Sequence, residues 1–459
     1  MKRDAEARRL LAAVAEAAKR SLMRAYLVGG AVRDRLLGLA TPNDLDFVVE
    51  QGSALELARL AAEELGAPPP VLFPRFHTAQ IFLPPWKLEF VDARRESYAQ
   101  DSRKPQVERA SLLEDLQRRD FTINAMAEEL ESGRLIDLLD GREDLQRRLL
   151  RTPLDPDETL RDDPLRMLRA VRFASSLGFS LESRLEEAVR RQAATLWGKV
   201  SPERVKVELD SILLLPHPAT AIALFDRVGL TQQILPELEA AKQVPQDKVQ
   251  ASNLFHHSLV TLQRAAEFLP NPLTPRERYA ALLHDLGKIG TMREEGGVLH
   301  FHGHSAAGAE IAVAILSRLR SSCEEIEEVS FLIRWHMLPA QYAPDWSDAA
   351  VKRLIRRLGP LLKATLRLSR ADIYGIERQE HDFWHLIKRI ETLGEEKVQQ
   401  VTSPLNGEEI MAIFAQGPGT FIGRIKEELV DAVLEGTLED SPRAARAYLR
   451  HNYQLPHSP

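Results

Sequence analysis

Residues 25–49 read AYLVGGAVRDRLLGLATPNDLDFVV, and the order of elements in the first part of this 459-residue chain follows from them. The apolar run 25–28 predicts a strand that ends at Gly29-Gly30. Residues 31–38 predict one or two helical turns, and turn-forming residues then precede a second strand over 45–49. A strand, a glycine turn, a short helix and a second strand indicate an α/β segment.

Asp44 and Asp46 are two residues apart at the start of the second strand, so both side chains project from the same face. Two carboxylates at this spacing can hold Mg²⁺ together with substrate phosphates. Gly29 and Gly30 let the backbone approach a phosphate, and the following helix offers free N–H groups. Arg33 can add a charge-assisted contact. Glycine turns and Asp-x-Asp pairs are common separately, so the prediction of a nucleotide site depends on their combination.

The rest of the chain separates into an α/β part and a helical part. Helical patterns over 3–20 and 53–66 and strand patterns over 78–83 and 88–91 fill the first 145 residues. From about residue 158, helical spacing of apolar residues dominates, interrupted by proline and glycine clusters. The sequence therefore predicts an α+β protein whose mixed or antiparallel head is followed by all-α domains.

Composition is ordinary for a globular protein, with 44% hydrophobic and 28% charged residues. No apolar run approaches the ~20 residues needed to cross a bilayer, and the charged N-terminus does not resemble a signal peptide. We therefore expect a cytoplasmic protein with no membrane partner. The single cysteine, Cys323, excludes an intrachain disulfide. The net charge is −6, so binding of nucleic acid must use local basic surface.

Two further motifs carry candidate nucleotide contacts: RRDFTINA at 118–125 and DDPLRMLRAVRF at 162–173. Arg166, Arg169 and Arg172 recur every three residues and would form a row suited to a polyanion. Asp163 and Arg166 would lie on one face of a helix. The Asp163 carboxylate offers hydrogen-bond acceptors and the Arg166 guanidinium offers donors, which together match the edge of cytosine or adenine, where a donor and an acceptor lie side by side. The alternative is a surface salt bridge worth under about 1 kcal/mol.

Seven of the 13 histidines fall between residues 256 and 336. The adjacent pair His284-Asp285 lies in the helical segment ALLHDLGK, and an imidazole beside a carboxylate can bind one metal. A second histidine from another helix would complete such a site, and Asp372 would supply the last ligand. Single histidines on helices are more often structural, and we favour a structural role for His256, His300, His381 and His385.

Taken together, GGAVRD, DLD, RRDFTINA and DDPLRMLRAVRF resemble the class II tRNA CCA-adding enzymes and the related bacterial poly(A) polymerases. This resemblance implies a five-stranded nucleotidyltransferase head followed by helical neck, body and tail. It also implies that the tRNA 3′ end attacks the α-phosphate of CTP or ATP and that pyrophosphate leaves. The usual Glu-Asp at the start of the last motif is Asp162-Asp163 here, which leaves the base-reading pair intact.

The resemblance implies a role for each matching position. Asp44 and Asp46 would hold Mg²⁺, and Glu89 would be the third carboxylate, favoured over Asp92, which lies on the opposite strand face. The nucleotide contacts would be Gly29, Gly30, Arg33, Arg119, Asp163, Arg166, Arg169 and Arg172. Asp163 and Arg166 would read the base edge. Arg169 and Arg172 would either help to bind phosphate or hold the base-reading pair in place. Residues 95–105 match the family's flexible loop, which mildly favours addition of the terminal A.

The histidine spacing resembles the HD superfamily of metal-dependent phosphohydrolases, through ALLHDLGK and the later GHSAAGAEIA. The resemblance implies a divalent metal of unspecified identity and a phosphatase or cyclic phosphodiesterase activity. The basic ligand set would be His257, His284, Asp285 and Asp372. His304 and His336 match the additional histidines of versions that can hold a second metal.

The predicted organisation is a head at 1–145, a neck at 146–210, a body at 211–245, an HD domain at 246–400 and a tail at 401–459. The predicted partners are tRNA, CTP and ATP. An enzyme that adds only CC or only A shares the head motifs and remains an alternative. A poly(A) polymerase is disfavoured, because that relative usually carries a basic tail and the C-terminal residues RHNYQLPHSP are not strongly basic. A phosphohydrolase with an RNA-binding, inactive head is the alternative from another class.

Overall fold

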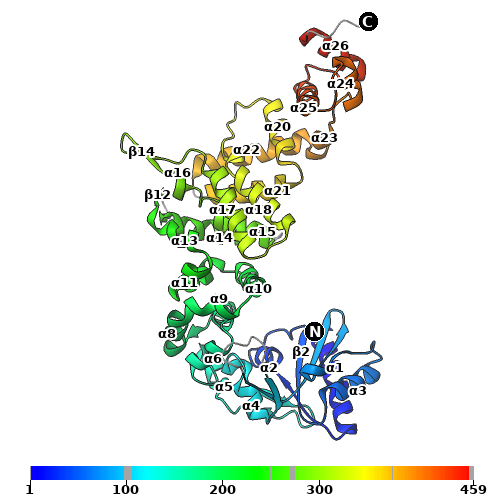
Figure 1. Cartoon of the computed structure of the whole chain (residues 1–459), viewed down its shortest axis with the longest axis vertical. Coiled ribbons are helices and arrows are strands. Elements are labelled where there is room, and N and C mark those ends of the chain that lie inside the picture. The colour runs from blue at the N-terminus through cyan, green and yellow to red at the C-terminus, as the bar shows by residue number, and fades with distance from the viewer. Residues whose placement is uncertain (1, 98–105, 249–250, 269–273, 375, 454–459) are drawn as a thin grey trace. The chain divides into compact units, whose positions relative to one another are not determined.

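The computed structural model describes residues 2–97, 106–248, 251–268, 274–374 and 376–453. Most of the predicted loop at 95–105 lies outside the described residues. The chain divides into two compact units, Met1–Pro236 and Glu237–Pro459 (Figure 1). The expected fold class is confirmed, because an N-terminal mixed sheet is followed by a mainly helical remainder. The finer division into five domains stays a prediction.

The first unit contains one sheet of seven strands rather than the expected five. The order across the sheet is β3 (Val71–Phe73), β4 (Thr78–Leu83), β5 (Trp86–Asp92), β2 (Asp44–Gln51), β1 (Arg24–Val28), β8 (Ala127–Glu129) and β9 (Leu135–Ile136). β2 and β5 are parallel, whereas the other neighbours are antiparallel. The count of five was implied by the family resemblance. The sequence pattern did not indicate β3, β8 and β9, because these strands have only two or three residues, too few for visible alternation.

The two faces of this sheet have different roles. On one face Phe47 of β2 stacks on Phe90 of β5, with ring centroids 4.9 Å apart. Helix α3 (Ala54–Leu65) covers this face, since Asp92 of β5 accepts a hydrogen bond from the amide of Ala54. On the other face Val48 packs against Leu116 of α4 (Leu112–Gln117). Helix α4 does not cover the beginning of β2, so the two aspartates there remain accessible on this face.

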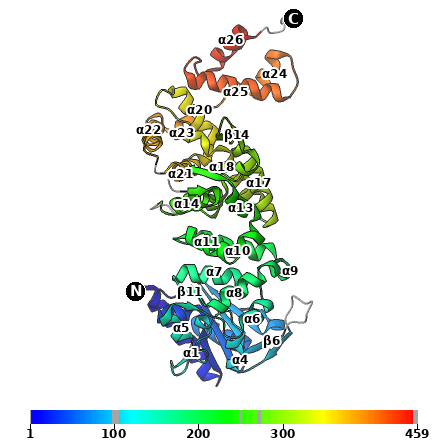
Figure 2. The same ribbon diagram turned by 90° about the vertical axis from the view of Figure 1, so that its left-hand side faces the viewer.

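The remaining elements of the first unit are mostly helices, which Figure 2 shows from a second direction. They are α1 (Lys2–Arg20), α2 (Gly30–Leu36), α5 (Gly141–Arg147), α6 (Pro156–Asp162), α7 (Arg166–Leu177), α8 (Ser183–Gln192), α9 (Leu196–Lys199), α10 (Pro202–Leu213), α11 (Pro218–Arg227) and α12 (Leu230–Ile234). Short strand pairs join β6 (Arg94–Ser97) to β7 (Gln106–Arg109) and β10 (Leu149–Leu150) to β11 (Ser180–Leu181). Helix α13 (Pro236–Ala240) spans the boundary between the units.

The second unit is a helical assembly with two short hairpins. Its helices are α14 (Leu254–Ala266), α15 (Pro275–Leu283), α16 (Lys288–Thr291), α17 (His304–Arg318), α18 (Cys323–Trp335), α19 (Met337–Ala340), α20 (Asp348–Leu358), α21 (Leu362–Ile373), α22 (Glu377–Leu393), α23 (Glu395–Gln400), α24 (Gly407–Phe414), α25 (Thr420–Glu435) and α26 (Pro442–Asn452). The hairpins pair β12 (Pro245–Lys248) with β13 (Ala251–Asn253) and β14 (Arg293–Glu295) with β15 (Val298–His300). Within the described ranges, no helix has the length and apolar character of a membrane span.

Candidate functional site

The first candidate site lies where β2 and β5 begin side by side. Asp44 and Asp46 occupy alternate positions of β2, and the parallel register places Asp46 beside Glu89 and Asp44 beside Lys87. These four side chains therefore belong to one face of two adjacent strands. Asp44 is exposed, whereas Asp46 and Glu89 are half-buried. The arrangement makes a small acidic surface that remains accessible to a ligand.

Glu89 and Asp92 have different surroundings. Glu89 accepts a hydrogen bond of 2.6 Å from Gln80 and lies 3.2 Å from the ammonium group of Lys87. Asp92 is buried on the opposite face, where it accepts a hydrogen bond from the Ala54 amide and pairs with Arg109 at 2.9 Å. These contacts commit Asp92 to holding α3 and β7. The geometry therefore favours Glu89 as the third carboxylate of the acidic surface.

The electrostatics of Asp46 suit a bound cation. Burial raises the pKa of Asp46, and the charges of Glu89 and Asp44 raise that pKa further, against the opposing effect of Arg119. Like charges that are held together while partly desolvated destabilise their ionised forms. A divalent cation between them would remove that cost. The residues present therefore fit the oxygen-rich site that magnesium requires.

Gly29 connects the acidic surface to the glycine turn. Its φ of 73° lies in the left-handed region, and a Cβ atom at this position would lie 3.3 Å from Asp46 Oδ2 and 3.6 Å from Arg119 Nη1. Glycine therefore permits both the turn and the close approach. Gly30 begins α2 directly after this turn. Gly29, Asp46 and Arg119 are thus brought together.

Arg33 and Arg119 are held by neighbours within the first unit. Arg33 is buried and donates hydrogen bonds to Asn124 at 2.7 Å and to Asp34 at 2.8 Å. Arg119 donates to the fully buried carboxylate of Asp115 at 3.1 Å, while its Nε has no hydrogen-bond partner among the described residues. Arg119 therefore borders the acidic surface with donor capacity left for a phosphate, whereas Arg33 braces the RRDFTINA segment.

Asp163 and Arg166 do not share one helix, contrary to the prediction. Asp163 ends α6 in an extended conformation (φ −137°, ψ 97°), and Arg166 is the first residue of α7. Pro164 is the physical reason, because a proline disfavours helical geometry in the residue before it. Asp163 pairs with Arg204 of α10 at 2.9 Å. Arg166 donates to the carbonyl oxygens of Thr159, at 3.1 Å, and Arg118.

Arg169 and Arg172 lie on α7 at the predicted spacing, but acidic partners neutralise them. Arg169 binds the buried carboxylate of Asp120 with two hydrogen bonds of 2.6 and 2.9 Å. Arg172 donates to Glu208 of α10 at 2.6 Å. These pairs tie α7 to the RRDFTINA segment and to α10. Their geometry supports a bracing role near Arg166 rather than a free row of charges.

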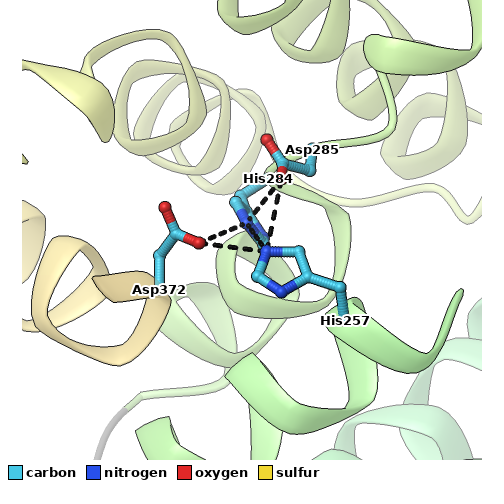
Figure 3. Close-up of side chains that lie close together, drawn as sticks. All are labelled: His257, His284, Asp285 and Asp372. Carbon is cyan, nitrogen blue, oxygen red and sulfur yellow. Dashed lines mark hydrogen bonds and ion pairs between the residues drawn. The ribbon is translucent and has the colours of Figure 1, made fainter. Parts of the chain in front are cut away.

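The second candidate site lies inside the helical bundle of the second unit (Figure 3). His257 comes from α14, His284 and Asp285 follow the end of α15, and Asp372 comes from α21. The ligand atoms of these four side chains approach one another within 4.8 Å. His257 Nε2 lies 3.2 Å from His284 Nε2, 3.3 Å from Asp285 Oδ2 and 3.0 Å from Asp372 Oδ1.

These distances match the spacing of ligands around one ion. With metal–ligand bonds of about 2.1 Å, neighbouring ligand atoms lie roughly 3.0 Å apart at right angles and roughly 3.4 Å apart in a tetrahedron. His284 is fully buried, and its Nδ1 faces the carbonyl oxygen of Ala281 at 3.0 Å, which leaves Nε2 directed at the cluster. A backbone partner on the second ring nitrogen is typical of metal-binding histidine. The four residues therefore form a cage that fits a divalent metal.

Asp285 also belongs to a second group of ligand atoms. Its Oδ1 lies 3.4 Å from His304 Nε2 and 3.6 Å from His336 Nε2. Both Asp285 Oδ1 and His336 Nε2 are buried and lack a hydrogen-bond partner among the described residues. Buried polar atoms without partners are costly, so this pair fits a second ion bridged by Asp285. All six predicted metal ligands of this region are therefore brought together.

Close backbone packing places His304 beside the cage. A Cβ atom at Gly287 would lie 2.0 Å from the carbonyl oxygen of His304 and 2.4 Å from the amide nitrogen of Gly308. Only glycine allows the turn after Asp285 to approach α17 this closely. Lys288 follows and donates a 2.6 Å hydrogen bond to Asp285. The short segment from Asp285 to Lys288 therefore sets the geometry of both ligand groups.

Comparison with known proteins gives the family. The chain is 33% identical over 446 residues to the A-adding tRNA nucleotidyltransferase of Deinococcus radiodurans, which covers 93% of this chain and 95% of that protein. The chain belongs to the tRNA nucleotidyltransferase family. The CC-adding enzyme of Thermus thermophilus is 35% identical, with 93% of each protein covered. The multifunctional CCA protein of Neisseria gonorrhoeae is 34% identical and covers 78% of this chain and 86% of that protein.

Three family models match successive parts of this tRNA nucleotidyltransferase. They are described as "Poly A polymerase head domain" for residues 25–151, "Probable RNA and SrmB- binding site of polymerase A" for 178–242 and "HD domain" for 254–374. The crystal structure of the Bacillus stearothermophilus CCA-adding enzyme in complex with CTP is similar in fold, with a TM-score of 0.67 at 23% identity and 96% of each chain covered. The protein is thus a nucleotidyltransferase with an HD domain, as the sequence predicted.

Some residues of these sites were not singled out from the sequence. Asp115 holds both Arg118 and Arg119, Arg204 pairs with Asp163, and Lys288 pairs with Asp285. Two of these contacts had a local signal, since Asp115 lies four residues before Arg119 and Lys288 three after Asp285. The contact between Arg204 and Asp163 joins residues 41 positions apart, and no periodicity indicates it.

Proposed function

We propose that this nucleotidyltransferase adds C, C and A in turn to the 3′ end of tRNA, using CTP and ATP. The observation that carries the proposal is the acidic surface of Asp44, Asp46 and Glu89 beside the Gly29 turn and Arg119. The names of the relatives support the same reaction class. The proposal places the protein in the cytoplasm, as expected from the sequence, with the domain boundaries predicted above.

In the proposed reaction, the 3′-hydroxyl oxygen of tRNA forms a new bond to the α-phosphorus of the nucleotide. The bond from that phosphorus to the bridging oxygen of the β-phosphate breaks, pyrophosphate leaves, and the hydroxyl proton passes to solvent. Gly29 and Gly30 let the backbone approach the triphosphate. Arg119 offers its remaining donors to the phosphate oxygens. Asp44, Asp46 and Glu89 provide the oxygen ligands for Mg²⁺, which supplies charge neutralisation and lowers the pKa of the hydroxyl.

Base selection is assigned to Asp163 and Arg166. Arg166 is oriented by the carbonyl oxygens of Thr159 and Arg118, and its guanidinium group keeps donors for a base edge. Asp163 is oriented by a hydrogen bond from Arg204, which leaves acceptor capacity for the amino group of cytosine or adenine. Uracil lacks this amino group, so the pair would discriminate against UTP.

A specific observation favours a second candidate, which is addition of only part of the CCA end. The relatives that match 93% of this chain are named A-adding and CC-adding enzymes. The acidic surface and the pair of Asp163 and Arg166 suit either task. The test uses three tRNA transcripts that lack the last three, two or one nucleotides, each with labelled CTP or ATP. Completion of all three supports the main proposal, whereas incorporation of only C or only A selects the second candidate.

For the second unit we propose metal-dependent hydrolysis of phosphate esters at the cage of His257, His284, Asp285 and Asp372. The divalent metal, whose identity is left open, supplies an activated water and charge neutralisation when bound. Water oxygen would bond to phosphorus as the ester oxygen leaves and takes a proton. Lys288 lies beside Asp285 and can orient a phosphate oxygen. Hydrolysis of p-nitrophenyl phosphate that depends on added divalent metal would support this; no hydrolysis with any divalent metal would refute it.

A further inference from the structure

The second unit carries a surface of alternating arginine and aromatic side chains, separate from both candidate sites. We call it the arginine–aromatic surface, and its members are Arg264, Phe268, Arg370, Tyr374 and Trp384. They come from three elements: α14 with the residues directly after it, the end of α21, and α22. Neither the acidic surface nor the metal cage uses any of these side chains.

The members contact one another as stacked cations and rings. The guanidinium carbon of Arg370 lies 4.7 Å from the ring centroid of Phe268 and 4.8 Å from that of Trp384. The guanidinium carbon of Arg264 lies 4.0 Å from the ring centroid of Tyr374. All three distances are within the range of cation–π attraction. The surface is therefore organised by its own contacts before any ligand arrives.

The rings and the charge are available to a ligand. Trp384 is 47% exposed and Tyr374 is 43% exposed, although an arginine guanidinium group already lies over each ring. Arg370 is half-buried, and its guanidinium group makes no hydrogen bond or ion pair in the part of the chain that the structure describes. Arg264 forms an ion pair with Glu267, with its Nη1 2.9 Å from the carboxylate oxygen. The surface therefore combines open aromatic area with an uncompensated positive charge.

The arginine–aromatic surface lies on the same helices as the metal cage. Arg264 follows the ligand His257 by seven residues on α14, which corresponds to about 10 Å along a helix axis. Tyr374 follows the ligand Asp372 by two residues, directly after the end of α21. Stacked nucleotides rise by about 3.4 Å each, so roughly three nucleotides span this separation.

We propose that the arginine–aromatic surface binds an unpaired RNA strand and thereby supplies RNA ends to the metal cage. Exposed aromatic rings stack on bases of any sequence, and arginine both attracts phosphates and stacks on bases. The combination of open rings and an unneutralised guanidinium favours this ligand over an acidic peptide, which would not use the rings. The inference rests on the hydrolysis proposed for the metal cage and would make RNA termini, rather than free nucleotides, the substrate class of the second unit.

The experiment locates the strand directly on the full-length protein. A single-stranded octanucleotide containing 4-thiouridine is crosslinked by ultraviolet light, and the modified peptides are identified by mass spectrometry. We expect crosslinks on peptides containing Tyr374 or Trp384. Crosslinks confined to residues 1–236, or their complete absence, would overturn the inference. Hydrolysis of p-nitrophenyl phosphate is assayed on the same preparation, so failure of the hydrolysis proposed for the metal cage is detected separately.

Binding of the same strand, followed by fluorescence anisotropy, tests individual members of the surface. Trp384→Leu and Tyr374→Leu should each raise Kd about tenfold, because each loses one base-stacking platform. Arg370→Met should also lower the slope of log Kd against log salt by about 0.7, whereas Arg370→Lys should keep that slope. The matched control is Phe82→Leu on β4, whose side chain is 49% exposed without an arginine partner among the described residues. Correctly folded variants with unchanged Kd and no loss of crosslinking would refute the assignment.

Discussion

The two candidate metal sites of this nucleotidyltransferase are built in opposite ways. The acidic surface uses three carboxylates on two adjacent strands and lies on an accessible sheet face. The cage in the second unit uses histidine and aspartate from separate helices, and three of its four main ligands are almost completely buried. In the described residues, the only groups of three or more ligand atoms within 4.8 Å of one another are the two in the second unit.

This difference indicates how each site would acquire its metal. The carboxylates of the acidic surface are held near one another but are not drawn tightly together, which suits an ion that arrives with a triphosphate. The cage already has ligand spacings of 3.0–3.6 Å and buried atoms without partners. A preorganised, desolvated cage suits a resident metal. The predictions below test whether the two sites are independent and which contacts maintain each one.

The largest expected effect comes from removing one carboxylate from each site. Asp46→Ala should reduce nucleotide incorporation by at least about 10³-fold, because a metal ligand contributes several kcal/mol of transition-state stabilisation. Hydrolysis of p-nitrophenyl phosphate should be spared. Asp285→Ala should have the reverse effect, since its two oxygens serve both ligand groups. Initial rates of both activities for each folded variant provide the measurement, and loss of both activities through one substitution would contradict independent sites.

The next effect concerns backbone packing at the cage. Gly287→Ala should reduce hydrolysis by about 100-fold, because its Cβ would lie 2.0 Å from the His304 carbonyl oxygen and displace α17. Nucleotide incorporation should change little. Gly290→Ala is the matched control, since a Cβ there meets nothing within 4 Å. Equal activity of the two variants would show that the close approach at Gly287 is not required.

A smaller effect is expected for the pair that braces α7 against the first unit. Asp120→Ala should lower the free energy of unfolding by about 2–3 kcal/mol, because Arg169 would lose the buried carboxylate that neutralises it. The first unit should unfold at lower denaturant concentration, with the second unit unaffected. Glu143→Ala, which breaks an exposed i,i+4 pair with Arg147, should cost under about 0.5 kcal/mol. Similar midpoints for the two variants would argue against the bracing role.

The smallest effect concerns base selection. Arg204→Met should lower the preference for CTP or ATP over UTP by about fivefold, because Asp163 loses a half-exposed partner worth roughly 1 kcal/mol. The ratio of kcat/KM values for correct and incorrect nucleotides gives the measurement. Arg184→Met, a change at an exposed arginine 3.7 Å from Asp155, is the control. A lower rate with an unchanged ratio would limit Arg204 to a structural role.

The predictability of each site follows from the sequence distance between its parts. Asp44 and Asp46 share a face because strand geometry repeats every two residues, and this local rule needs no tertiary information. Glu89 required the register between β2 and β5 to be placed beside Asp46. The assignment of Asp163 and Arg166 to one helix was wrong because the local effect of Pro164 ends α6 before them. The sequence pattern did not indicate strands β3, β8 and β9 because each has only two or three residues, too few to show a period.

Local chemistry along the chain was sufficient to specify the glycine turn, the paired aspartates, the adjacent His284 and Asp285, and the change from an α/β head to helices. Tertiary packing was needed for the contacts that bring distant residues together. Arg169 meets Asp120 across 49 residues, and His257 meets Asp372 across 115, because buried charges and imidazoles must find partners within a folded core. Short-range periodicity sets where side chains point, but burial and close backbone approach set which of them meet.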